Sequence, residues 1–197
     1  MTVISFPFVL AYDRGRFLRR EHIAPGSAVY SLLPETEKAF REIAEPQAYY
    51  ALPSSPLSME GVSGGARILC AATLGEGISG LMQERTEAGH VTEAYLLSAL
   101  ADEALFALSE ALCRKLREDF PALSSPLFPG DALPLPLQKD ILDCFRRERF
   151  WVDITINHSF MLTPEKTMLW LFPAENSGAA DTPCAVCSRH GSCFPGS

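Results

Sequence analysis

The segment TEAYLLSALADEALFALSEALCRKLRED, residues 92–119, decides the fold of this chain of 197 residues. Leucines recur along it at the spacing of one helical face, at Leu96, Leu97, Leu100, Leu105, Leu108, Leu112 and Leu116. Thr92 is expected to cap the first turn, because a threonine hydroxyl can accept a hydrogen bond from a backbone N–H there. The pattern predicts a long helix at the centre of the hydrophobic core.

Four further segments have helical patterns, and they flank the central one in the sequence. They are residues 11–21, 34–45, 75–89 and 137–147. Pro34 is expected in the first turn of its helix, where a missing N–H costs nothing. In the last helix Ile141, Leu142 and Phe145 form the inward face.

Strand patterns occur in two pairs. Residues 48–52 and 67–74 are separated by a loop rich in proline, serine and glycine. Residues 151–157 alternate, with Val152, Ile154 and Ile156 on one face, and residues 168–172 are their expected partner strand. The connection between this second pair is long for a hairpin, and long ordered loops are often functional.

The composition bounds the class of protein. A hydrophobic content of 47% is that of a folded globular domain, and we expect an α+β domain over residues 1–173 followed by an irregular tail over residues 174–197. A net charge of −7 with no basic run argues against nucleic-acid partners. The first apolar run meets Asp13 and Arg14 too soon to span a membrane. These features predict a cytoplasmic protein.

Three cysteines crowd the tail, in the stretch CAVCSRHGSC. Cys184 and Cys187 have the two-residue spacing at which both sulfurs can face one ion, and Cys193 follows shortly after. Three thiolates suit zinc or an iron–sulfur cluster, both of which take four ligands, and the alternative is a set of free thiols. The fourth ligand stays open between His190, a second subunit, a substrate and the other cysteines, Cys70, Cys113 and Cys144.

The remaining candidate groups are expected to be structural. Cys70, Cys113 and Cys144 fall within predicted strands and helices, where a cysteine is usually a small buried group. The histidines His22, His90 and His158 are scattered and are expected at the surface.

A glycine pattern, GEGISG, lies between a predicted strand and a predicted helix, where a dinucleotide-binding loop would occur. Gly75, Gly77 and Gly80 fit the spacing of a dinucleotide-binding loop. The next segment is helical, and no acidic residue follows a second strand. Without a βαβ context the motif is weak, so dinucleotide binding is not expected.

Four segments, taken in order, resemble the activation domain of cobalamin-dependent methionine synthase in its small stand-alone form. They are AEPQAYYALP, CAATLGEGISGLMQERTEAGHVTEAYLLSALADEAL, SPLFPGD and VDITINHSFMLTPEKTM. The resemblance implies an α+β fold with a bent antiparallel sheet and flanking helices. It also implies a role in methionine biosynthesis: the domain binds S-adenosylmethionine and methylates a cobalamin in the inactive cob(II) state, while an external donor supplies an electron.

The resemblance also implies a site and a partner. Pro129 and Gly130 match the family's S-adenosylmethionine turn, and Lys166 matches a lysine of the fourth segment, so these three are the expected cofactor-binding residues. Pro126 stands at the position of the family's arginine, and the tyrosine position is either occupied by Asp131 or deleted. Losing a charge-assisted bond to the methionine carboxylate costs about 1.5 to 3 kcal/mol.

The chain has no cobalamin-binding motif of its own, so the corrinoid is expected on a separate methyltransferase protein. Two functions stay open. One is an accessory protein that reactivates the corrinoid by reduction or methylation, with the cysteine tail holding a cluster or zinc. The other is a non-enzymatic module that binds the corrinoid protein and has a degenerate S-adenosylmethionine site.

Overall fold

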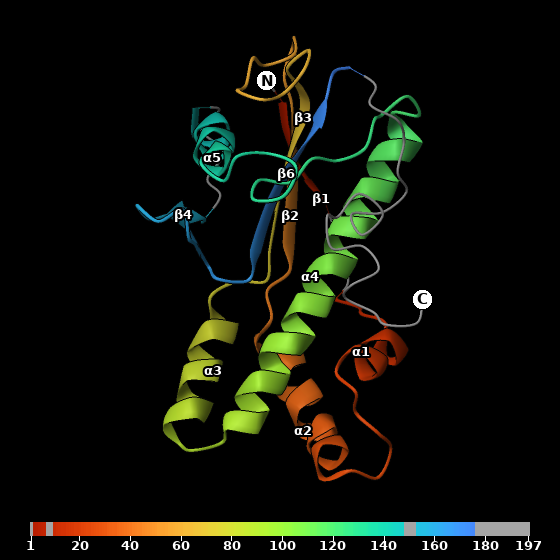
Figure 1. The fold of residues 1–197 in the computed structure, drawn as a ribbon, viewed down its shortest axis with the longest axis vertical. Helices are drawn as coiled ribbons and strands as arrows, with labels where there is room; N and C mark the ends of the chain where they lie inside the picture. Colours follow the sequence, from red (N-terminus) through yellow and green to blue (C-terminus); the bar gives the residue numbers. More distant parts are fainter. Residues whose placement is uncertain (1, 7–9, 148–152, 176–197) are drawn as a thin grey trace.

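A computed structural model describes residues 2–6, 10–147 and 153–175. Its centre is a four-stranded antiparallel sheet in the order β1-β2-β3-β6 (Figure 1). The strands are β1 (Thr2–Phe6), β2 (Gln47–Leu52), β3 (Ala66–Thr73) and β6 (Thr167–Pro173). Tyr50, Cys70 and Trp170 form one row across the β2–β3 and β3–β6 pairings. The predicted strands at 48–52 and 67–74 are confirmed, and the structure pairs them as β2 and β3.

Helix α4 (Val91–Asp119) covers one face of the sheet (Figure 1). All seven leucines of the predicted stripe are buried, which confirms this helix as the centre of the core. The expected cap is wrong: the helix begins at Val91, so Thr92 lies inside the first turn, and His90 takes the cap position. The His90 Nδ1 instead contacts Glu93 Oε1 at 2.9 Å.

Three shorter helices pack around α4 on the same side of the sheet. They are α1 (Arg14–Arg20), α2 (Ala28–Ile43) and α3 (Gly77–Glu87). Helix α2 begins earlier than the sequence predicts, because Ser27 caps it by accepting the Tyr30 N–H at 3.1 Å and Leu33 is buried. Pro34 therefore lies in the interior of the helix, with its ring exposed to solvent.

A second layer covers the opposite face of the sheet. Helix α5 (Leu137–Arg147) buries the predicted residues Ile141, Leu142 and Phe145 against it. Strands β4 (Thr155–Ile156) and β5 (Leu162–Thr163) form a short hairpin beside α5 (Figure 1). The sheet thus separates two cores.

One predicted strand pairing is wrong. The strand at 168–172 pairs with β3, whereas the segment near Ile156 pairs with Leu162, inside the expected loop. The reason is that β6 is apolar on both faces and needs a position between the two layers. Val152, the first residue of the expected alternating face, lies outside the described residues.

The proline-rich segment between α4 and α5 contains no helix or named strand. Across the described residues, no helix combines the length and the apolar character needed to cross a bilayer.

Candidate functional site

The turn at residues 125–131 runs along the outer edge of β6. Leu127 and Leu171 exchange two backbone hydrogen bonds, with the Leu127 N–H donating at 2.8 Å and the Leu171 N–H at 3.1 Å. Phe128 stacks on Trp170 of β6, with ring centroids 6.0 Å apart and an interplanar angle of 28°. These contacts fix the turn at the border between the two layers.

The tip of the turn is closed by its own backbone. Gly130 has a φ of +88°, which favours glycine, and its N–H donates to the Leu133 carbonyl at 2.8 Å. The Asp131 N–H donates to the Phe128 carbonyl at 3.2 Å, and Pro129 has no N–H. With proline at 126, the turn has no guanidinium fork, so it does not fit a methionine carboxylate in the way that the resemblance implies. Cofactor binding at Pro129 and Gly130 stays a prediction.

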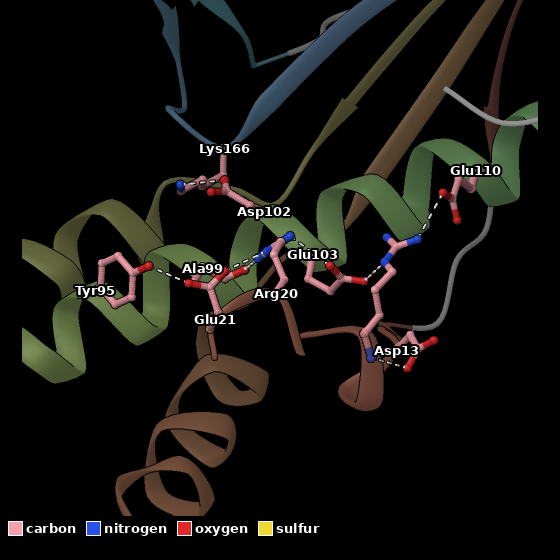
Figure 2. Close-up of polar contacts among 10 residues, drawn as sticks. Asp13, Arg20, Glu21, Tyr95, Ala99, Asp102, Glu103, Glu110 and Lys166 are labelled. Atoms are coloured by element: carbon pink, nitrogen blue, oxygen red, sulfur yellow. Dashed lines mark hydrogen bonds and ion pairs between the residues drawn. The ribbon is translucent and has the colours of Figure 1, made fainter. Parts of the chain in front are cut away.

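Lys166 is buried and already paired with helix α4. Its Nζ donates to Ser98 Oγ at 2.8 Å. It also donates to Asp102 Oδ1 at 2.8 Å (Figure 2). The side chain of Lys166 is 8% exposed, whereas that of Asp102 is 48% exposed. The Lys166 carbonyl also accepts the Leu74 N–H at 3.0 Å. This arrangement ties the loop before β6 to α4 at the end of the sheet.

Gly130 and Lys166 are held by different contacts. The turn that carries Gly130 is joined to β6 through Leu127 and Leu171, whereas Lys166 is held by helix α4. The Lys166 amine also faces α4. A ligand role for Lys166 therefore stays a prediction.

A buried charge network, which sequence reasoning missed, is centred on Glu103, the residue that follows Asp102 on α4. Glu103 is 0% exposed, and it accepts hydrogen bonds from Arg16 Nε at 2.5 Å and from Arg20 Nη1 at 2.9 Å (Figure 2). Arg20 also donates to the Ala99 carbonyl at 2.8 Å. Burial raises the pKa of Glu103, while the guanidinium groups oppose that shift. The network joins α1 to α4. The i,i+4 spacing of Arg16 and Arg20 places both cations on one face of α1, and it is the sequence signal that could have found the network.

The cysteines and histidines of the domain lie where the sequence predicts. Cys70, Cys113 and Cys144 are free and buried. The histidines at 22, 90 and 158 are exposed. Burial raises the pKa of Cys113 to about 12 and that of Cys70 well above its usual value.

The proposed metal ligands Cys184, Cys187 and Cys193, and His190 with them, lie outside the described residues. Within the described ranges, no group of three or more histidine, cysteine or carboxylate side chains is arranged to hold a metal ion. The tail site stays a prediction.

The glycine pattern after β3 serves packing. A Cβ on Gly77 would lie 2.5 Å from the Ile43 side chain, so this glycine lets α3 approach the end of α2. In the described sheet, β3 pairs with antiparallel neighbours on both sides. A dinucleotide loop needs a parallel βαβ unit, so the expectation against it agrees with the topology.

No protein-family model and no curated protein sequence matches this chain. Its structure is similar to the crystal structure of the MetH reactivation domain bound to AdoHcy, with a TM-score of 0.61 and 15% sequence identity. The match covers 91% of this chain and 81% of that chain. At 15% identity, the match shows similarity of fold alone. The chain therefore has the α+β fold of the MetH reactivation domain, as its sequence predicts.

Proposed function

We propose that this protein is an accessory protein for a corrinoid-carrying protein and acts in the reactivation of the corrinoid. The observation that carries the proposal is the similarity of fold to the MetH reactivation domain over 91% of the chain. The segments of sequence resemblance support it, because they fall on β3 through α4, on the turn beside β6 and on the loop that Lys166 anchors. The corrinoid is carried by a separate methyltransferase, and the protein acts in the cytoplasm.

A docking experiment tests this proposal. Purified full-length protein is mixed anaerobically with a corrinoid methyltransferase loaded with cob(II)alamin and analysed by size-exclusion chromatography with absorbance detection. Co-elution of the two proteins is expected, and the same methyltransferase without corrinoid is the control. Separate elution at concentrations of tens of micromolar contradicts the proposal.

The second part of the proposal concerns an S-adenosyl ligand, because the structural neighbour is bound to AdoHcy. Calorimetry with AdoHcy and S-adenosylmethionine tests whether this chain retains such a ligand. Methylcobalamin formation from S-adenosylmethionine and a one-electron donor, followed by absorbance, distinguishes a reactivating enzyme from a docking module. Co-elution without methylcobalamin formation favours the non-enzymatic alternative.

The third part concerns the tail, in which Cys184, Cys187 and Cys193 bind zinc or an iron–sulfur cluster. A cluster can relay the electron that reactivation needs, whereas zinc has no redox step. Metal analysis and the absorption spectrum of anaerobically purified protein decide between them. Replacing the three cysteines by serine is expected to remove the metal, whereas Cys144→Ser is expected to retain it; loss of metal in neither variant contradicts the tail site.

A further inference from the structure

Strand β1 forms one edge of the central sheet, and its outer side is open in the described part of the chain. At the opposite edge β6 is covered, because Leu127 and Leu171 exchange two backbone hydrogen bonds. None of the described residues outside β2 forms a backbone hydrogen bond with β1. An uncovered edge strand can pair with a strand of another chain. The edge at β1 is therefore the place where a second chain can extend the sheet.

The strand registers determine which backbone groups of β1 point outwards. Backbone N–H and C=O groups alternate in direction along an antiparallel strand, and those of Leu171 point away from β3, towards the turn. When this alternation is followed through the registers of β6 with β3, β3 with β2 and β2 with β1, the backbone groups of Ile4 face Tyr50 of β2. The groups of Val3 and Ser5, on either side of Ile4, therefore point outwards.

Strand β1 lacks the features that usually keep an edge strand from pairing. Its sequence, TVISF, contains no charged residue, proline or glycine, and its five residues pair with β2 without a bulge. The neighbouring strand, QAYYAL, is also uncharged. Edge strands that stay single commonly have a lysine, a proline or a bulge. Although the net charge of the chain is −7, two copies can meet at this edge without placing like charges in the paired strands.

The outward groups of β1 are complementary to those of a second β1 strand. An antiparallel pair centred on Ile4 places Val3 of each copy opposite Ser5 of the other, and each such pair can exchange two hydrogen bonds. It also places the two Ile4 side chains opposite each other. Ile4 is only partly buried by the core on the α4 side, so this pairing removes more of it from water. Such a contact is the same on both copies and closes on itself.

We infer that two copies of this chain associate through their β1 strands, so that the two four-stranded sheets form one continuous sheet. The edge has only five residues, whereas stable interfaces bury about 1,200 to 2,000 Å² in total, so the dimer is weak, with a dissociation constant in the micromolar range. The inference does not rest on the proposed function. The turn beside β6 lies at the other edge of the sheet and stays free in the dimer.

Sedimentation equilibrium of the full chain, from low micromolar to several hundred micromolar concentration, tests the inference. The average mass is expected to rise towards twice that of the monomer. Ser5→Pro removes an outward N–H at a position where an edge strand tolerates proline, and it is expected to weaken association at least tenfold. The matched control, Ser5→Ala, keeps the N–H and is expected to change association less than threefold.

Amide hydrogen exchange followed by NMR gives a second readout that needs no variant. Protection of the Val3 and Ser5 amides is expected to rise with protein concentration, because a second copy covers them. The Ile4 amide faces β2 in both states, so its protection is expected to change much less with concentration. This difference between neighbouring residues separates edge pairing from association through another surface.

A monomer mass at several hundred micromolar overturns the inference, as does undiminished association in Ser5→Pro with a native circular dichroism spectrum. Protection of Val3 and Ser5 that is independent of concentration also overturns it, because the edge is then covered within one chain. Ser5→Pro is expected to co-elute with the corrinoid protein as the wild type does. If only the wild type co-elutes, the edge binds that protein instead of a second copy. Failure of wild-type docking alone counts against the proposed function and leaves the mass measurement to decide the dimer.

Discussion

Glu103 is a carboxylate placed inside the molecule, and it is stable there because two guanidinium groups reach it. Arg16 and Arg20 are only partly buried, with side chains 27% and 18% exposed. Water therefore hydrates the arginine charges in part, but it does not reach the carboxylate of Glu103, whose side chain is 1% exposed. Removing the carboxylate leaves two cations beside an apolar helix face.

Glu103→Ala is expected to lower the free energy of unfolding by about 2 to 4 kcal/mol, since breaking a buried ion pair costs about 3 to 5 kcal/mol and the arginines retain some hydration. The matched control is Glu110→Ala, which removes a more exposed carboxylate 3.4 Å from Arg16. Its expected cost is below about 1 kcal/mol. Urea unfolding followed by circular dichroism measures both, and equal costs contradict the central role of Glu103.

Cys113 is expected to resist alkylation in the folded protein. Its pKa of about 12, raised by burial from an ordinary 9.0, lowers the thiolate fraction near pH 8 about a thousandfold. Iodoacetamide labelling followed by peptide mass spectrometry is expected to modify Cys113 only in urea. The raised pKa also makes the free energy of unfolding depend on pH. Above pH 9 the unfolded chain releases the thiol proton, whereas the folded chain keeps it. The free energy of unfolding therefore falls as the pH rises from 9 towards 12. Rapid labelling of native protein at pH 8 contradicts the assignment.

Sequence reasoning works for the cysteines and fails for Glu103, for a physical reason. A cysteine inside an apolar pattern is buried whatever its neighbours are, so the local pattern is sufficient. A carboxylate on a leucine-rich face is buried only if cations arrive from elsewhere, and Arg16 is 87 positions away. The pairing belongs to the tertiary structure.

At the scale of elements, the connection between β2 and β3 depends on one close approach. Gly65 has a φ of +81°, and a Cβ there would lie 2.6 Å from the Leu57 carbonyl oxygen. That oxygen accepts the Ala66 N–H at 2.7 Å, which closes the base of the loop. The loop in turn forms one wall of a cleft of about 790 Å³ beside α5.

Gly65→Ala and Gly26→Ala separate backbone strain from steric overlap. Gly26 has a similar φ of +82° with nothing within 4 Å of its Cβ position. Gly26→Ala is expected to cost about 1 to 2 kcal/mol from the left-handed backbone alone. Gly65→Ala adds about 1 to 3 kcal/mol of overlap. Equal midpoints of urea unfolding contradict the close contact at Leu57.

Periodicity predicts that an element exists better than it predicts its ends or its partners. The helix over residues 137–147 agrees with α5 because its apolar face alone defines it. The predicted start of α2 is wrong. Pro34 is typical of a first turn, but the Ser27 cap and the buried Leu33 extend the helix towards the N-terminus. The predicted partner of β6 is wrong because the apolar sequence of a strand does not specify which strand it pairs with. Its actual neighbour, β3, is far away in the sequence.

At the scale of the whole molecule, the sheet divides the described residues into two layers of unequal strength. The α4 side combines four helices around the larger core, and the α5 side has one helix of 11 residues and a hairpin with strands of two residues each. Local opening is cheaper where fewer apolar contacts are broken. The α5 layer, which carries the cleft, is therefore the less stable one.

Hydrogen exchange is expected to show this difference. Amides of α5 and the β4–β5 hairpin should exchange at least tenfold faster than those in the middle of α4. Mass spectrometry of peptides from residues 137–147 and 100–112 measures both. Uniform protection across the two layers contradicts the division.

The sequence predicts the fold class of the whole molecule, but it predicts the contacts of the candidate site only in part. The resemblance and the helix pattern together predict the α+β architecture that the structural comparison supports. They do not predict that Lys166 turns to Asp102 or that Arg147 and Glu60 lie on one cleft. Those placements depend on how the helices and loops of each layer pack against the sheet. Local sequence patterns do not specify this packing.

The antiparallel pairing of β3 with β6 has a consequence for synthesis of the protein. Thr73 and Thr167 join at one end of this pairing, although 94 positions separate them. At about 5 to 20 residues per second, a ribosome leaves β3 without β6 for roughly 5 to 20 seconds, although β2 is already present on its other side. The α3–α4 hairpin can form in that interval, but one apolar edge of β3 stays open until β6 emerges. Nascent chains halted before residue 167 are thus the forms in which this protein most needs a chaperone.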